Sequence, residues 1–210
     1  KNIAKLSIIS IIALISPLSV VNAATGTINV VTEVPTPTNN VTPEYTFNSD
    51  STGSIAYTGP CSSALTTLVS TGNTTITLNS LPEWTYSTCT IQVNNEEWSG
   101  NILTLAAFTI DTTPPVVTLS GTSIETIAQG SIYIDSWATW IDLIDGSGII
   151  LTATTGVIDT SSVGSGILTY SYTDNAGNTG SATRIINITD QTAPEVNLSG
   201  STNINIIQSG

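Results

Sequence analysis

An internal repeat sets the size of the folding unit in this chain. The segment DTTPPVVTLSGTSIETIAQGS (111–131) aligns with DQTAPEVNLSGSTNINIIQSG (190–210), with nine of 21 positions identical at a spacing of 79 residues. This spacing exceeds that of solenoid repeats and suits a small self-contained domain. We therefore expect tandem domains, with a new unit that begins at Asp190 and is cut off at Gly210.

Short apolar runs with a period of two fill residues 111–189 and predict strands with one buried face. Clusters of Gly, Asp and Asn separate these runs at intervals of about 8 to 12 residues, which is typical of β-sandwiches. The runs are Val117 and Leu119, Ile132 and Ile134, residues 149–153, Leu168 with Tyr170 and Tyr172, and Ile186 with Ile188. Residues 25–110 have the same character. The fold class that we expect is all-β, with tandem immunoglobulin-like β-sandwich domains.

The N-terminal segment predicts export from the cell. Two lysines precede an apolar run at 6–21, which is followed by the small residues of a cleavage site. The run contains a proline and is shorter than the roughly 20 residues that span a bilayer, so a membrane anchor is the weaker alternative. We expect a signal peptide at 1–23 and a secreted or cell-surface protein, with no membrane insertion after cleavage.

The charged residues exclude several functions. Removal of the signal peptide leaves Arg184 as the only basic residue against 15 acidic ones, a formal charge of −14. Nucleic acids and anionic membrane surfaces need clustered Lys and Arg, so neither is expected as a partner. The chain has no histidine, which removes Ser-His-Asp catalysis and imidazole metal ligands. We expect no enzyme and no catalytic residues.

The predicted organisation is a signal peptide at 1–23, immunoglobulin-like domains at 24–110 and 111–189, and the start of a third repeat at 190–210. The second domain resembles bacterial immunoglobulin-like repeats of large secreted or cell-surface proteins. It is also similar to the immunoglobulin-like modules of some pesticidal crystal proteins and, more distantly, to hyalin repeats. The resemblance lies in IDTTPP (110–115), YID (133–135), and YSYTDNAGN (170–178).

The first domain resembles another bacterial immunoglobulin-like type, and it contains both cysteines of the chain. The resembling segments are TPEYTF (42–47), GPCSS (59–63) and YSTCTI (86–91). Because Cys61 and Cys89 lie in one domain of an exported protein, a disulfide between them is expected. Two free thiols are the alternative, and the long spacing between the cysteines leaves no C-x-x-C redox motif.

Acidic residues suggest a metal site. In an immunoglobulin-like sandwich, Asp111 would enter the first strand, Asp142 and Asp145 would lie between the second and third, and Asp174 would follow the sixth. These places share one pole of the sandwich, where Ca²⁺ could bind six to eight oxygens. Asp190 repeats the position of Asp111 for the next unit. The alternative is that these residues only form Asx turns.

These observations predict a non-enzymatic spacer array of a secreted or cell-surface protein that serves adhesion and is stiffened by calcium. Its expected partners are neighbouring repeats of the same chain and a host or cell-surface glycan or protein. One alternative is a set of accessory modules of a secreted hydrolase or toxin. Another is a carbohydrate-binding module in which tryptophans form a platform for sugar rings, the candidates being Trp84, Trp98, Trp137 and Trp140.

Overall fold

A computed structural model describes residues 26–68, 70–96, 98–197 and 199–200, which contain fifteen β-strands and no helix. The all-β prediction is confirmed. None of the described residues forms a helix long and apolar enough to cross a membrane. The predicted signal peptide at 1–23 lies outside the described residues, as does the second half of the predicted third repeat, from 201.

Residues 26–110, called the first unit below, contain nine strands. They are β1 (Ile28–Thr32), β2 (Glu44–Ser49), β3 (Gly53–Thr58), β4 (Thr67–Leu68), β5 (Gly72–Thr77), β6 (Trp84–Tyr86), β7 (Thr90–Asn94), β8 (Leu103–Thr104) and β9 (Phe108–Ile110). One sheet has the order β1-β2-β5, a second has the order β4-β3-β7-β8, and β6 pairs with β9. Alternate side chains of these strands are buried in one hydrophobic cluster, as period-two patterning requires.

The cysteines lie in that cluster. Cys61 and Cys89 form the predicted disulfide, with their Cα atoms 5.4 Å apart, and both side chains are buried. The bond closes a loop that contains β4, β5 and β6. On the chain-entropy description, a loop of this length contributes about 3 to 4 kcal/mol to the stability of the first unit.

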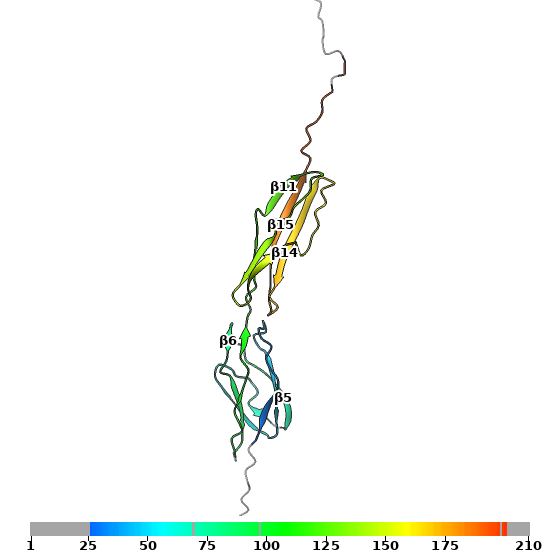
Figure 1. The fold of residues 1–210 in the computed structure, drawn as a ribbon. Coiled ribbons are helices and arrows are strands. Elements are labelled where there is room, and N and C mark those ends of the chain that lie inside the picture. The colour runs from blue at the N-terminus through cyan, green and yellow to red at the C-terminus, as the bar shows by residue number, and fades with distance from the viewer. Residues whose placement is uncertain (1–25, 69, 97, 198, 201–210) are drawn as a thin grey trace, which may run out of the picture.

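Residues 111–189, called the second unit, contain the other six strands. They are β10 (Val116–Leu119), β11 (Ile124–Ala128), β12 (Ala138–Asp142), β13 (Gly146–Ile150), β14 (Gly164–Thr173) and β15 (Thr179–Thr189). Two sheets with the orders β10-β12-β13 and β11-β15-β14 enclose a second, smaller cluster around Ala138, Leu168, Tyr170 and Ile186. The chain enters this unit at one pole and leaves it at the other, so that the two units follow one another along an elongated molecule (Figure 1).

The structure corrects one part of the predicted core. Ile132 and Ile134 were expected on a buried strand face, but they lie outside the strands and their side chains are 89% and 81% exposed. Exposed and half-buried residues do alternate here, but it is Tyr133 and Asp135, rather than the two isoleucines, whose side chains are half-buried. Both of these side chains bind the guanidinium group of Arg184 in the interior, which fixes the orientation of the segment.

Two buried tyrosines of the first unit predict opposite effects of the same substitution. The hydroxyl of Tyr45 is buried and has no hydrogen-bond partner in the part of the chain that the structure describes. Burial, with Glu33 as a second cause, raises its pKa to about 12. The hydroxyl of Tyr86 donates to the carbonyl of Pro82 at 2.7 Å. Tyr86→Phe should lower the free energy of unfolding by about 1 kcal/mol, whereas Tyr45→Phe should leave it unchanged or raise it. Urea denaturation of both variants measures this, and an equal loss in both would contradict it.

Candidate metal site at the junction of the two units

Three of the predicted carboxylates meet where the two units join. Asp111 directly follows β9, Asp142 is the last residue of β12, and Asp174 directly follows β14. One carboxylate oxygen from each lies within 4.8 Å of the other two. All three residues are buried, with exposures of 1%, 8% and 6%. Strand ends from different parts of the sequence thus bring three acidic groups together in a place that water scarcely reaches.

Each carboxylate also holds its own turn, so the predicted alternative of Asx turns is present as well. Oδ1 of Asp142 accepts from the backbone N–H groups of Ile144 and Asp145, at 2.7 and 2.9 Å. Oδ1 of Asp174 accepts from the backbone N–H of Asn178 at 2.7 Å. These bonds explain the local chain path. They do not explain why three such turns face one another.

One carboxylate oxygen of Asp111 takes no part in these turns. Its Oδ1 accepts from the backbone N–H of Thr113 at 3.2 Å. Its Oδ2 is buried and has no hydrogen-bond partner among the described residues. An ionised oxygen buried without a partner is costly, so this atom needs either a proton or a cation.

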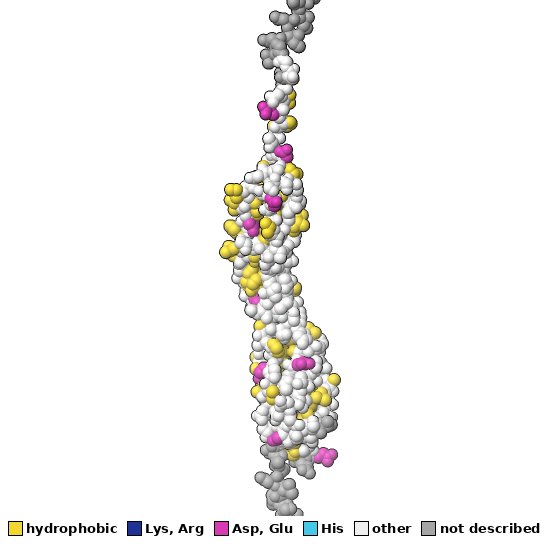
Figure 2. All heavy atoms as spheres, turned by 90° about the vertical axis from the view of Figure 1, so that its right-hand side faces the viewer, with side chains coloured by type: hydrophobic (Ala, Val, Ile, Leu, Met, Phe, Trp, Pro, Cys, Tyr) yellow, Lys and Arg dark blue, Asp and Glu magenta, His cyan; other side chains and the backbone are white. Residues whose placement is uncertain are grey.

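The negative charge of the three carboxylates is not balanced by any basic side chain of the described residues. Burial, followed by repulsion from Asp142, Asp174 and Glu83, raises the pKa of Asp111. Arg184 is the only basic side chain in the described part of the chain, and its ion pairs are to Glu125 and Asp135. On the face drawn in Figure 2, acidic side chains are scattered along both units and no basic side chain is visible. A cation from solution is therefore the available counter-charge.

The residues around Asp111 connect the two units. The backbone N–H of Asp111 donates to the carbonyl of Thr38 in the first unit at 2.9 Å. Its carbonyl accepts from the side-chain amide of Asn178 in the second unit, also at 2.9 Å. Oε2 of Glu83 accepts from the hydroxyls of Thr112 and Thr113 at 2.9 and 2.8 Å, which lowers the pKa of Glu83. The cluster thus lies at the connection between the units.

The other two predicted ligands lie outside this cluster. Oδ2 of Asp145 accepts from the backbone N–H of Asn175 at 2.8 Å and so joins two neighbouring turns. Asp190 follows β15 at the opposite pole of the second unit, and its Oδ1 accepts from Thr192 at 2.9 Å. This bond reproduces the one that Oδ1 of Asp111 accepts from the backbone N–H of Thr113, as the repeat predicts. Glu83 and Asn178 were not predicted, because their roles depend on how the units and turns meet.

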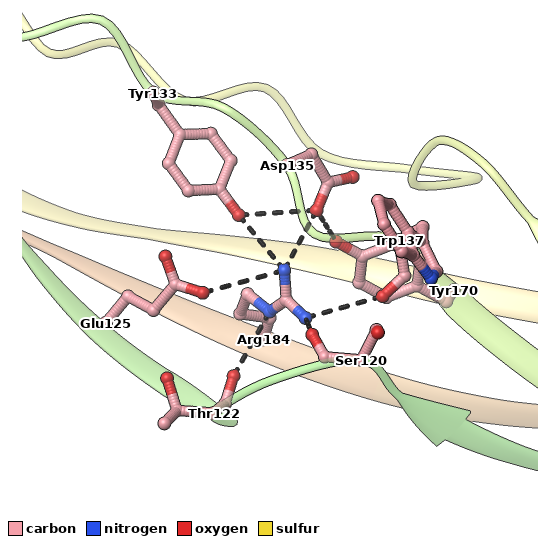
Figure 3. A network of polar contacts seen from close by, with 8 residues as sticks. All are labelled: Ser120, Thr122, Glu125, Tyr133, Asp135, Trp137, Tyr170 and Arg184. Atoms are coloured by element: carbon pink, nitrogen blue, oxygen red, sulfur yellow. Dashed lines mark hydrogen bonds and ion pairs between the residues drawn. The ribbon is translucent and has the colours of Figure 1, made fainter.

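A second polar centre of the second unit surrounds Arg184, whose side chain is fully buried on β15 (Figure 3). Its guanidinium group forms ion pairs with Asp135 at 3.0 Å and Glu125 at 3.6 Å. It also lies over the ring of Tyr170, 5.6 Å from the centroid. The remaining donors bind the hydroxyl of Tyr133 and the backbone carbonyls of Ser120, Thr122 and Trp137. The group is thus fully used in holding the surrounding segments.

Comparison with known proteins supports the sequence resemblance. Residues 117–188 match the family described as "Bacterial surface protein, Ig-like domain". The predicted resemblance to bacterial immunoglobulin-like domains is therefore confirmed for these residues.

The chain is also similar to two sea-urchin proteins named hyalin. The protein from Lytechinus variegatus is 36% identical over 100 residues, which cover 45% of this chain and 19% of the relative. The protein from Strongylocentrotus purpuratus is 38% identical over 106 residues, which cover 46% of this chain and 9% of the relative. The chain thus spans less than a fifth of the length of these curated relatives.

Two of the four tryptophans named for sugar binding take part in packing. The ring of Trp140 stacks on that of Tyr172, with centroids 3.6 Å apart. Trp98 packs against the hydrophobic cluster of the first unit. Trp84 and Trp137 are the exposed ones, at 71% and 47%. The rings of Trp98 and Trp140 are thus partly covered by other residues of the chain.

The Arg184 network predicts a large effect of one substitution. Arg184→Met should lower the free energy of unfolding by about 3 kcal/mol, because the carboxylate of Asp135 and three backbone carbonyls lose their donor. Adding Asp135→Asn should recover part of this loss, since it removes the uncompensated charge. Chemical denaturation of the single and double variants measures both effects. Strictly additive losses would contradict the proposed coupling.

The raised pKa of Asp111 predicts how stability depends on pH without metal. A carboxyl whose pKa is higher in the folded state stabilises the fold below its unfolded pKa, and this stabilisation is lost as the pH rises through the folded pKa. In EDTA, the contribution of Asp111 to the free energy of unfolding should therefore increase as the pH falls from about 7 toward the unfolded value near 4. The contributions of Asp50, Glu83 and Asp159, whose pKa values are lowered, should instead decrease. The first of these contributions should be absent in Asp111→Asn. Denaturation at several pH values tests this, and identical slopes would contradict it.

Proposed function

We propose that this chain is part of an extracellular spacer, in which immunoglobulin-like units in tandem hold an adhesive part of a secreted or cell-surface protein at a distance. The family of the second unit, the elongated arrangement of the units and the 79-residue repeat support this proposal. The role is non-enzymatic. Its partners are neighbouring repeats of the same chain and a glycan or protein on a host or cell surface.

Calcium bound at the junction would give the spacer its stiffness. The observation that carries this proposal is the buried, unpartnered Oδ2 of Asp111, which belongs to a group of three carboxylates. Two oxygens on one Ca²⁺ ion can lie up to about 4.6 to 5.2 Å apart, since each bond is 2.3 to 2.6 Å long. The 4.8 Å limit within which Asp111, Asp142 and Asp174 meet fits this requirement.

The position of Asp111 explains why a bound cation would stiffen the molecule. Its backbone N–H donates a hydrogen bond to the carbonyl of Thr38 in the first unit. Its side chain faces the ends of β12 and β14 in the second unit. Three carboxylates that share a cation would attract one another through it, whereas without it they repel. The connection would then be fixed at several points rather than hinged at one segment.

The calcium proposal predicts that one substitution has opposite effects in two solutions. In EDTA, Asp111→Asn should raise the melting temperature, because it removes repulsion within the buried cluster. With calcium at a hundred times its Kd, the wild-type chain should gain about 2.7 kcal/mol. The variant should lose most of this gain, because an amide oxygen is a weaker ligand than a carboxylate. Thermal melting of both proteins in both solutions measures the four values.

Asp190→Asn is the matched control, because Asp190 forms the same Asx turn as Asp111 but lies outside the three-carboxylate cluster. It should leave the calcium response unchanged. Magnesium, which needs shorter bonds of 2.0 to 2.1 Å and retains its waters, should stabilise the wild-type chain less. A wild-type melt that is the same in calcium and in EDTA would refute the metal site. Small-angle scattering of the two states would test the change in stiffness.

A further inference from the structure

The path of the chain through the second unit determines how that unit would respond to tension. The chain enters the unit after β9 and leaves it after β15, at opposite poles (Figure 1). A spacer of the kind proposed above is pulled through these two points whenever its ends are held apart. The inference below rests on that proposed function, but its test does not depend on calcium.

Strands β11 and β15 are the elements that oppose such a pull. They are parallel neighbours over five residue pairs, from Ile124 opposite Ile185 to Ala128 opposite Thr189. Tension from the N-terminal side draws β11 toward the entry pole, and tension from the C-terminal side draws β15 toward the exit pole. The strands would have to slide past one another along their axes. All hydrogen bonds between them are then loaded together rather than one after another.

Both ends of this strand pair are secured by further bonds. The backbone N–H of Ile185 donates to Ser123 at 2.9 Å, and that of Gln129 donates to Thr189 at 3.0 Å. The side chain of Gln129 also donates to the carbonyl of Ser161 at 2.7 Å. The bonded region thus extends beyond the five pairs on the β11 side, from Ser123 to Gln129.

Arg184 attaches the segment that precedes β11 to β15. Its guanidinium group binds the carbonyls of Ser120 and Thr122 and the carboxylate of Glu125, and all of its own atoms are buried (Figure 3). A pull that arrives from β10 must therefore break charge-assisted bonds that water cannot readily replace before it reaches β11.

We propose that β11 and β15, with Arg184 as the connection to the segment before β11, form a mechanical clamp that keeps the second unit folded under tension along the spacer. The unit would then resist tension in addition to serving as a spacer. The clamp follows from the direction of the strands and not from the overall stability of the unit. The same fold should therefore be strong in one direction of pulling and weak in another.

Single-molecule force spectroscopy on the full chain tests this directional difference. Pulled by its two ends, the second unit should give the higher unfolding force. Pulled between a cysteine introduced by Ser162→Cys and the C-terminus, it should unfold at a several-fold lower force. In that geometry the antiparallel pair β14–β15 opens from Gly164 opposite Ile188, one residue pair at a time. Equal forces in the two directions would overturn the proposal.

The length of chain that is released identifies which unit has unfolded. Residues 111–189 release about 260 to 280 Å at 3.3 to 3.6 Å per residue. The first unit releases about 190 to 210 Å, because the bond between Cys61 and Cys89 keeps the loop between them closed. Unfolding of the second unit can therefore be recognised in the end-to-end recordings, whereas in the other geometry only residues 162–189 of the unit are extended, which release about 90 to 100 Å.

Proline substitutions on β11 test which hydrogen bonds carry the load. The bonds at Ser123 and Gln129 place the odd-numbered residues of β11 toward β15, so the N–H of Ile127 faces β15 and that of Thr126 faces the open edge. Ile127→Pro should lower the end-to-end force several-fold, whereas Thr126→Pro should change it little. Ile127→Ala removes the same packing but keeps the N–H.

Circular dichroism and urea denaturation establish that each variant is folded before it is pulled. A drop in Ile127→Ala as large as that in Ile127→Pro would show that packing, and not the strand pair, resists the force, and would overturn the clamp. A loss of the calcium response with an intact directional difference would refute only the stiffened junction. Intact calcium binding with equal forces in both directions would refute only the clamp.

Discussion

The buried guanidinium group of Arg184 is the interaction on which the architecture of the second unit depends. The hydrophobic cluster there is small, with four buried residues, so apolar contacts alone leave the segments around 120–137 weakly held. Arg184 gathers the carbonyls of three of their residues together with two carboxylates. Burying a guanidinium group is costly, and the cost is offset only because its donors have partners. The polar centre therefore imposes one arrangement on segments that are otherwise irregular.

Two unusual features of that region follow from this requirement. Trp137 is the only non-glycine residue with a positive φ, 52°, in the described part of the chain, and its carbonyl accepts from Arg184 and from Ser120. A left-handed backbone at such a residue costs about 1 to 2 kcal/mol, which these bonds offset. Ile132 and Ile134 face solvent because the residues beside them, Tyr133 and Asp135, are needed inside. Local preferences are overridden wherever the guanidinium group needs a partner.

The sequence predicted the features that depend on strand pattern and topology. The all-β class, the disulfide and the proximity of Asp111, Asp142 and Asp174 follow from period-two runs and from the place of each strand end in a sandwich. The orientation of residues 132–134 could not be predicted from hydrophobicity, because the deciding partner lies about 50 residues away. One signal was nevertheless present, since Arg184 has the same parity as the buried Ile186 and Ile188 on β15. Glu83 carried no such signal, because its role depends on contacts at the junction.

The two polar centres both bury charged side chains, but they differ in where the opposite charge comes from. At Arg184, a buried cation is compensated by carboxylates of the same unit, so this region is complete as the chain folds. At Asp111, three buried carboxylates face one another and no basic side chain of the described chain compensates them. Because the described chain has one basic residue, the charge that holds this junction together has to come from cations in solution. The interior of the unit would then be held without a cation from solution, while the connection between units would respond to the cations around it.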